Sequence, residues 1–187
     1  MAINFLSEES LLSKEELQIR DSVRSFVAKE VEPTLKQAHR TEEFPKELIP
    51  RFGELGLLGS NLEGYECPGL GDVAYGLIMQ ELEYADSGIR SFCSVQGALV
   101  MFPIWAYGSE ELKQRYLPQL SSGEMVGCFG LTESDAGSNP GGMKTKAVAV
   151  DGGYKISGSK MWITNGNIAD IAIVWAKLDG RVTGFVV

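Results

Sequence analysis

The sequence predicts an α+β fold, in which an all-α helical domain at residues 1–120 precedes an antiparallel β domain at residues 121–187. Two observations predict this class. Apolar residues recur every three or four positions through most of the first 120 residues, as they do on one face of a helix. From about residue 125 they alternate with polar residues in short segments bounded by turn residues, which is typical of half-buried strands.

The first helix is predicted from its start signal. Ser13 and Glu16 form the S-x-x-E pattern of a capping box. We expect the helix to end at Pro33, because proline lacks a backbone N–H. The apolar residues at helical spacing between these two points are Ile19, Val23, Phe26, Val27 and Val31. A second helix is expected over about residues 46–55.

Three further signals divide the rest of the helical part. Asp72 is expected to cap a third helix, whose buried face would carry Val73, Leu77, Ile78 and Leu82. The sequence DSG at residues 86–88 predicts a break, after which an apolar segment runs to about Tyr107. Ser109 is expected to cap a last helix, with Gly123 just beyond its end.

The β part is predicted from five short segments. They are MVGCFGL from residue 125, MKTKAVAV from 143, YKISGSKMWIT from 154, ADIAIVWAK from 169 and VTGFVV from 182. The pairs Asp151-Gly152 and Asp179-Gly180 stand between neighbouring segments and indicate hairpin turns. The hairpins favour antiparallel pairing.

The charge of the chain excludes one class of partner. Its net charge is −8, and binding of nucleic acid without sequence preference needs a basic face. Residues 1–120 hold 11 basic and 19 acidic side chains, whereas residues 121–187 hold 6 of each. The β part could therefore receive an anionic ligand without opposing it by its own charge.

Histidine and cysteine are too few for several kinds of site. With His39 as the single histidine, a Ser/His/Asp triad or a metal site of several histidines is hard to build, and we expect no metal. Cys67, Cys93 and Cys128 are widely spaced and odd in number, which favours free thiols. No secretory signal or membrane span is evident, so we expect a cytoplasmic protein.

Two polar segments of the β part are candidates for binding. The loop FGLTESDAGSNPGG, residues 129–142, combines four glycines with the hydroxyls of Thr132 and Ser138, which suits a flat polar ring and a phosphate. It matches no standard phosphate loop, and an ordinary connecting loop is the alternative. In KMWITNG, residues 160–166, a strand would place Trp162 and Thr164 on the same side, although a tryptophan is more often part of the core.

A third candidate lies in ELEYADSGIRSFCSVQ, residues 81–96. Arg90 enters an otherwise apolar helix, with Ser91 beside it and Ser94 one turn later. The planar guanidinium group favours a carboxylate or a phosphate as its partner. An internal ion pair to Glu83 or Asp86 is the alternative.

Together these segments resemble one family. FGLTESDAGS at 129–138 and GSKMWITNG at 158–166, with helices before strands, resemble the acyl-CoA dehydrogenases, flavoenzymes that oxidise acyl-CoA thioesters between the α and β carbons. The sequence from Gly53 to Ser138 is most similar to the members that act on glutaryl-CoA. The resemblance implies FAD as cofactor, electron-transfer flavoprotein as partner, and a homotetramer at full length.

The resemblance also implies roles for single residues. Phe129, Leu131 and Thr132 would line one side of the flavin ring, and Trp162, Ile163 and Thr164 the other side. Gly137 and Ser138 would approach the pyrophosphate or the CoA arm. The carboxylate at the far end of glutaryl-CoA would meet Arg90, Ser91 and Ser94, with Glu83 in the same polar network.

The resemblance stops short of a complete enzyme. In the family a C-terminal helical domain supplies the catalytic glutamate, and that domain is absent from this sequence, so we assign no catalytic residue. The implied reaction gives crotonyl-CoA and CO2 from glutaryl-CoA. The alternatives are a dehydrogenase for another short acyl-CoA, and a truncated, non-catalytic module that binds acyl-CoA or flavin.

Overall fold

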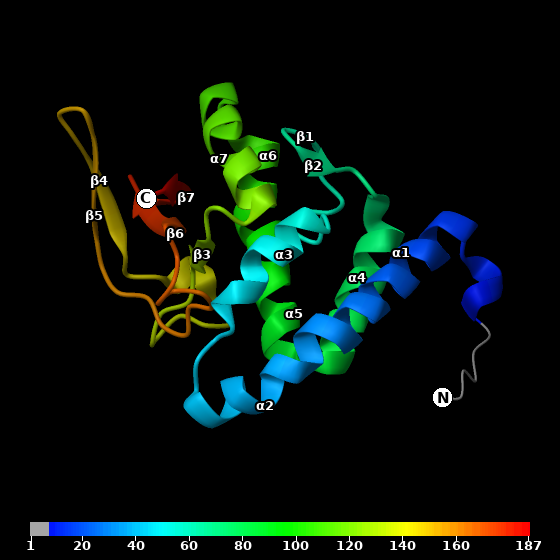
Figure 1. Ribbon diagram of the computed structural model, residues 1–187. Coiled ribbons are helices and arrows are strands. Elements are labelled where there is room, and N and C mark those ends of the chain that lie inside the picture. Colours follow the sequence, from blue (N-terminus) through cyan, green and yellow to red (C-terminus); the bar gives the residue numbers. More distant parts are fainter. Residues whose placement is uncertain (1–7) are drawn as a thin grey trace.

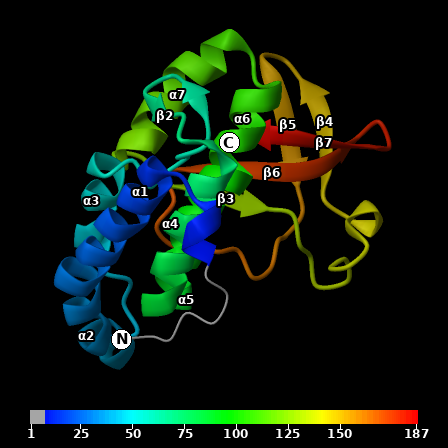
Figure 2. The same ribbon diagram turned by 90° about the vertical axis from the view of Figure 1, so that its right-hand side faces the viewer.

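The computed structural model describes residues 8–187. Helices occupy the chain up to Ser122, and a five-stranded sheet begins at Gly127; the helices lie on one side of the molecule and the sheet on the other (Figure 1, Figure 2). The predicted order of a helical part followed by strands is confirmed. The division into two domains at residue 120 stays a prediction, because buried residues of both parts belong to one hydrophobic core.

The first long helix begins as expected but continues past its expected end. After a 3-10 turn at Glu8–Leu11, helix α1 spans Lys14–Phe26, and both hydrogen bonds of the Ser13/Glu16 capping box form. A π-helical turn at Val27–Val31 then leads directly into α2, Glu32–Thr41. The expected stop at Pro33 is wrong, because this proline lies in the first turn of α2, where a backbone N–H would lack a helical partner anyway.

The next two helices follow the prediction more closely. A 3-10 turn at Lys46–Leu48 precedes α3, Ile49–Glu54, and a small hairpin of β1, Glu63–Gly64, and β2, Cys67–Pro68, precedes α4, Gly71–Ala85. Asp72 is not the cap of α4, because its carboxylate instead accepts a hydrogen bond from Asn61. Val73 is exposed, whereas the other residues expected on the buried face are buried: Leu77, Ile78 and Leu82.

The apolar segment after α4 is the central helix of the helical part. Asp86 breaks the chain as expected and caps α5, Ser87–Ser94; a π-helical stretch, Val95–Met101, and α6, Phe102–Tyr107, continue it. By length and composition this run could cross a membrane, but half of its most apolar stretch is buried inside the protein. Its apolar character is therefore accounted for by the core. Helix α7, Glu110–Ser122, has the expected Ser109 cap and ends at Gly123 in the left-handed conformation.

The sheet is mixed instead of wholly antiparallel. The two expected hairpins form, β4 with β5 and β6 with β7, but β6 also pairs in parallel with β3 and β4. The parallel pairs arise because β6 lies between β3 and β4 instead of beside β5. After the loop of residues 158–170, β6 runs opposite to β5 and therefore in the same direction as β4. The bounds are β3, Gly127–Gly130; β4, Lys146–Val150; β5, Gly153–Ser157; β6, Ile171–Leu178; and β7, Arg181–Val186.

The sheet is anchored to the helices by polar as well as apolar contacts. The side chain of Gln96 is fully buried; its amide group donates to the carbonyls of Leu120 and Met125, and its oxygen accepts from the N–H of Gly127. A Cβ atom at Gly127 would lie 2.3 Å from Cγ1 of Val100. Glycine therefore lets β3 lie directly against the central helix.

Candidate flavin-ring pocket

A pocket of about 230 Å³ lies where β3, the central helix and the 158–170 loop meet. Six of its lining residues are those assigned to the flavin ring from the sequence, although they come from segments about 30 residues apart. The central helix contributes the other two. The lining residues are Val95, Leu99, Phe129, Leu131, Thr132, Trp162, Ile163 and Thr164.

One wall of the pocket is the end of β3. Phe129 is half-buried and packs edge-on against Trp175 of β6, with ring centroids 6.0 Å apart. Leu131 and Thr132 follow the last residue of the strand, and the N–H of Met161 donates to the carbonyl of Thr132 over 2.9 Å. The strand thus presents side chains to the pocket while its continuation is hydrogen-bonded to the opposite wall.

The opposite wall is a turn, and the expected strand at this place is wrong. Strand β5 ends at Ser157, so Trp162 and Thr164 are not on a strand. Trp162 has a left-handed backbone, with φ of 58°, and is 86% exposed, so the alternative of a core tryptophan is wrong as well. Such a backbone is a genuine outlier for a bulky residue and is typical of functional sites.

A buried ion pair that sequence reasoning missed joins the two walls. Nζ of Lys160 lies 2.9 Å from Oε1 of Glu133 and donates to the carbonyl of Leu131 over 3.0 Å. The side chains of Lys160 and Glu133 are only 11% and 7% exposed. Glu133 also accepts bonds from the N–H of Lys144 and from the N–H and hydroxyl of Thr145. The pair is therefore well satisfied.

The charge state of Glu133 follows from these bonds. Burial alone would raise the pKa of its carboxyl group, but the hydrogen bonds from Thr145, the Lys144 backbone and Lys160 outweigh burial and lower that pKa to about 2. Glu133 is therefore ionised at neutral pH. The only sequence signal for the pair is the presence of two charged residues inside the two candidate segments, which does not show that they meet.

The composition of the pocket fits a flat, partly polar ring. Phe129, Leu131 and Trp162 supply apolar surface, and the side-chain hydroxyls of Thr132 and Thr164 have no hydrogen-bond partner among residues 8–187. Apolar walls with a few well-placed polar groups are typical of cofactor sites. The two hydroxyls can donate to acceptor atoms at the edge of a ring.

Gly137 and Ser138 do not line this pocket. Both are exposed, in the loop that follows the turn closed by backbone hydrogen bonds between Glu133 and Ala136. A Cβ atom at Gly137 would meet no atom within 4 Å, so the space around this glycine is open. A ligand approaching it would do so from solvent, and the assigned role for the pyrophosphate or CoA arm stays a prediction.

Arg90 forms the internal ion pair that was considered as the alternative to ligand binding. Its Nε donates to Glu83 over 2.6 Å, and its Nη1 lies 3.4 Å from the hydroxyl of Ser94. The side chain of Arg90 is 35% exposed. The Arg90 guanidinium and the Ser87 hydroxyl lower the pKa of the Glu83 carboxyl group.

The residues assigned to the substrate carboxylate lie near the pocket without lining it. Arg90, Ser91 and Ser94 are on α5, which runs directly into Val95 of the pocket. At 1.5 Å per residue, Val95 lies roughly 7 Å along the helix from Arg90.

Other kinds of site find no support in the described part of the chain. Within residues 8–187, no three His, Cys, Asp or Glu side chains lie together as metal ligands would. The three cysteines are free thiols, and burial raises the pKa of Cys93 far above its usual range. His39 contacts the carboxylate of Asp86 at 2.8 Å. None of these residues faces the pocket.

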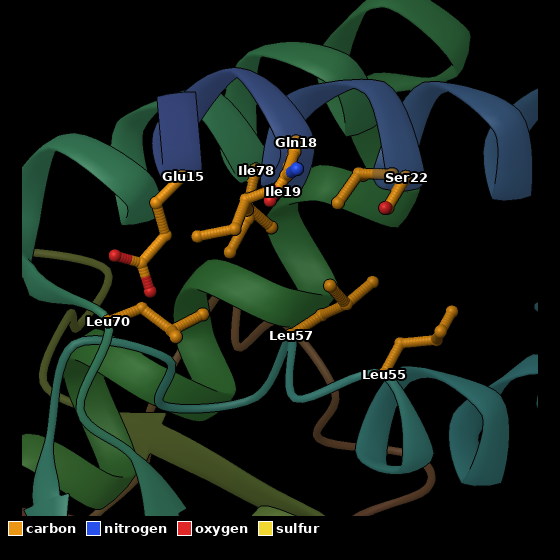
Figure 3. A pocket seen from close by; sticks show the side chains of 9 residues that line it. Glu15, Gln18, Ile19, Ser22, Leu55, Leu57, Leu70 and Ile78 are labelled. Carbon is orange, nitrogen blue, oxygen red and sulfur yellow. The ribbon is translucent and has the colours of Figure 1, made fainter. Parts of the chain in front are cut away.

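A second hollow, of about 310 Å³, lies on the helical part. Figure 3 shows side chains of α1, among them Glu15 and Ile19, opposite Leu57 and Leu70. Its surface is mainly apolar, and it contains none of the residues that the sequence assigned to cofactor or substrate. The candidate site is therefore the smaller pocket at the junction.

Comparisons with known proteins identify the family of the chain. The chain matches the family models "Acyl-CoA dehydrogenase, N-terminal domain" over residues 13–124 and "Acyl-CoA dehydrogenase, middle domain" over residues 128–187. An acyl-CoA dehydrogenase of Bacillus subtilis is 37% identical over 88% of this chain and 44% of its own length.

Two solved structures are similar over nearly the whole chain. Glutaryl-CoA dehydrogenase of Mycobacterium smegmatis, solved in complex with FADH2, has a TM-score of 0.93 and 50% identity over 96% of this chain and 46% of its own. A chain from the structure of the electron transferring flavoprotein of Acidaminococcus fermentans has a TM-score of 0.90 and 32% identity, covering 100% of this chain and 49% of its own. The chain thus spans about half the length of these relatives, and it belongs to the acyl-CoA dehydrogenase family.

Proposed function

We propose that this chain forms the flavin-binding and acyl-binding part of an FAD-dependent glutaryl-CoA dehydrogenase. The reaction is α,β-dehydrogenation with loss of CO2, which gives crotonyl-CoA. The observation that carries the proposal is the pocket at the junction, where six residues assigned to the flavin ring line one cavity. The similarity to a glutaryl-CoA dehydrogenase that was solved with FADH2 supports the cofactor and the substrate.

In this proposal FAD supplies the acceptor for the hydride that leaves the β carbon. The residues of this chain hold and orient the ring. Trp162 and Phe129 would cover it from the two walls, and the free hydroxyls of Thr132 and Thr164 would donate to acceptor atoms at its edge. Gly137 and Ser138 approach the phosphate-bearing arms from the exposed loop.

The acyl group would lie along the central helix. Arg90 is suited to the far carboxylate of glutaryl-CoA because a guanidinium group has five N–H donors, of which Glu83 and Ser94 use one each. Ser91 would add a hydroxyl donor, and the hydroxyl of Ser94, which donates to the Ser91 carbonyl in the structure, would turn to the substrate. Glu83 orients the guanidinium group by accepting from its Nε.

The chain's own residues provide no catalytic base in this proposal. We assign that role to none of its carboxylates. Glu133, for example, accepts hydrogen bonds from Lys144, Thr145 and Lys160, which give it a structural role. Electrons would pass to an electron-transfer flavoprotein, a partner that the similarity to the Acidaminococcus fermentans chain supports. A homotetramer and a cytoplasmic location are further parts of the proposal.

One observation favours a second candidate. Arg90 already has a carboxylate partner within the protein, so its charge is not free for a substrate in the way that a buried, unpaired arginine would be. A dehydrogenase for another short acyl-CoA would use the same flavin pocket, with Arg90 and Glu83 as a structural pair.

The test is an anaerobic titration of the protein with FAD, followed by glutaryl-CoA or butyryl-CoA, with the visible flavin spectrum recorded at each step. Tighter binding of glutaryl-CoA than of butyryl-CoA, seen as a shift of the flavin spectrum, supports the first proposal, and equal or tighter binding of butyryl-CoA supports the second. Bleaching of the flavin is not expected from this chain alone, because no catalytic base is assigned to it. If FAD does not bind, the assignment of the pocket is wrong.

A further inference from the structure

The turn that carries Trp162 is held in an unfavourable conformation. Its left-handed backbone, with φ of 58°, persists only where the surrounding structure fixes it. Burial of the indole cannot do so, because Trp162 is 86% exposed. Other contacts of the turn must therefore fix its conformation.

The contacts that hold this turn come from the opposite wall. Before Trp162, the ammonium group of Lys160 donates to the Leu131 carbonyl and to Glu133, and the N–H of Met161 donates to the Thr132 carbonyl. After Trp162, the side chain of Asn165 donates to the Gly127 carbonyl over 3.2 Å. Each of these bonds joins the turn to β3 or to the residues that follow it. Lys160 is the only charged residue among the donors.

Glu133 is itself held in place by separate contacts. The N–H groups of Lys144 and Thr145 and the hydroxyl of Thr145 all bind its carboxylate, so its position does not depend on Lys160. A carboxylate that is fixed on one side can orient a lysine on the other. A buried ion pair is in general weak evidence for stability but can specify one geometry.

We propose that Lys160 and Glu133 are positioning residues, whose ion pair holds the Trp162 turn against the end of β3 and so keeps the pocket formed before a ligand arrives. Neither Lys160 nor Glu133 lines the pocket. The proposal rests on the proposed function only in identifying the occupant of the pocket as the flavin ring.

The test is the double variant Lys160→Met with Glu133→Gln, which removes both charges together so that no buried charge is left unpaired. The matched control is Arg24→Met with Glu81→Gln. That pair is hydrogen-bonded through two contacts, at 2.9 and 2.7 Å, and Glu81 is 5% exposed although Arg24 is 57% exposed; it joins α1 to α4 away from the pocket. Melting temperatures first establish that both variants are folded at the temperature of measurement.

The first readout needs no flavin. Amide hydrogen exchange at Met161 and the NMR signal of the Trp162 indole report on the turn directly, the latter assigned with Trp162→Phe. We expect exchange at Met161 to become at least about tenfold faster in the pocket variant, with a shifted or broadened indole signal, because the turn opens locally. In the control variant, the exchange rate of Met161 should change by less than about twofold, and the indole signal should not shift or broaden.

The second readout is FAD affinity. If losing the pair reduces the fraction of protein with a formed pocket to about one tenth, the apparent Kd for FAD rises about tenfold. Unchanged Met161 exchange and indole signal in the pocket variant would overturn the proposal, as would equal changes in the control. If the unaltered protein fails to bind FAD, the proposed function fails. Faster Met161 exchange in the Lys160/Glu133 variant but not in the control would still support the positioning role of the ion pair.

Discussion

Replacing Arg90 with methionine tests the substrate assignment most directly. Methionine keeps an unbranched side chain of similar length and removes the guanidinium group. Glutaryl-CoA ends in a carboxylate and butyryl-CoA in a methyl group. A contact between Arg90 and the carboxylate therefore contributes to binding of the first ligand and not of the second.

The magnitude follows from the exposure of Arg90 and from its free donors. A hydrogen bond to a charged group contributes about 1.5–3 kcal/mol. Since Arg90 is 35% exposed and already bound to Glu83, we take the lower end of that range. A loss of about 1.5 kcal/mol corresponds to roughly a tenfold weaker Kd for glutaryl-CoA. Butyryl-CoA should bind as before.

The assay is titration of the FAD-loaded protein with each ligand, with the flavin spectrum as the signal. The matched control is Arg51→Met, because Arg51 is similarly exposed and also paired, with Glu30 and Glu54, but lies on α3. The control should leave both affinities unchanged. An unchanged ratio of the two affinities in Arg90→Met would refute the carboxylate assignment and leave the pair with Glu83 as a structural one.

Three stability predictions follow from the buried polar groups and the close approach of β3. Gln96→Leu removes three hydrogen bonds to backbone groups and should lower the free energy of unfolding by about 3 kcal/mol, measured by urea titration. The lowered pKa of the Glu133 carboxyl group stabilises the fold by about 3 kcal/mol above about pH 4.5, and this contribution is lost as the pH falls towards 2. Glu133→Gln should therefore make the free energy of unfolding, measured by urea titration, less dependent on pH between these values. Gly127→Ala should cost about 1–3 kcal/mol by overpacking, and Val100→Ala in the same chain should recover part of the lost melting temperature.

The features predicted correctly from the sequence are those with a local signal. The capping box at Ser13 depends on residues three apart, and the Ser109 cap and the Gly123 end of α7 are equally local. The turn at Asp179-Gly180 has both residues at positive φ, as a tight hairpin of this kind requires. Each of these structures satisfies its own backbone groups within a few residues, so the pattern is sufficient to identify it.

The wrong predictions concern segments that lack such a local signal. Pro33 was expected to end a helix, but the π-helical turn before it lets the helical path continue, and nothing in the neighbouring sequence marks that turn. The alternation around Trp162 resembles a strand, yet contacts with β3 fix it as a turn. At Trp162 the conformation is decided by tertiary contacts, which a short window of sequence does not contain.

The sequence predicted part of the lining of the candidate pocket. The flavin-ring residues were assigned from the resemblance, and the structure brings all six together in one pocket. The resemblance did not indicate that Arg90 would be half exposed or that Lys160 and Glu133 would join the walls. Contacts between residues 27 positions apart depend on the mixed topology of the sheet, which the hairpin signals alone did not predict.

The position of β3 beside the pocket depends on the central helix, which turns one face to the pocket and another to the strand. Val95 and Leu99 line the pocket, while Gln96 between them faces inward and binds the N–H of Gly127 at the start of β3. The buried amide thereby fixes where the strand begins relative to the helix. Apolar packing alone would allow the strand to slide, because the hydrophobic effect has no direction. The walls of the pocket are therefore set by hydrogen bonds on both sides: Gln96 holds β3 against the helix, and Lys160 holds the turn against the end of β3.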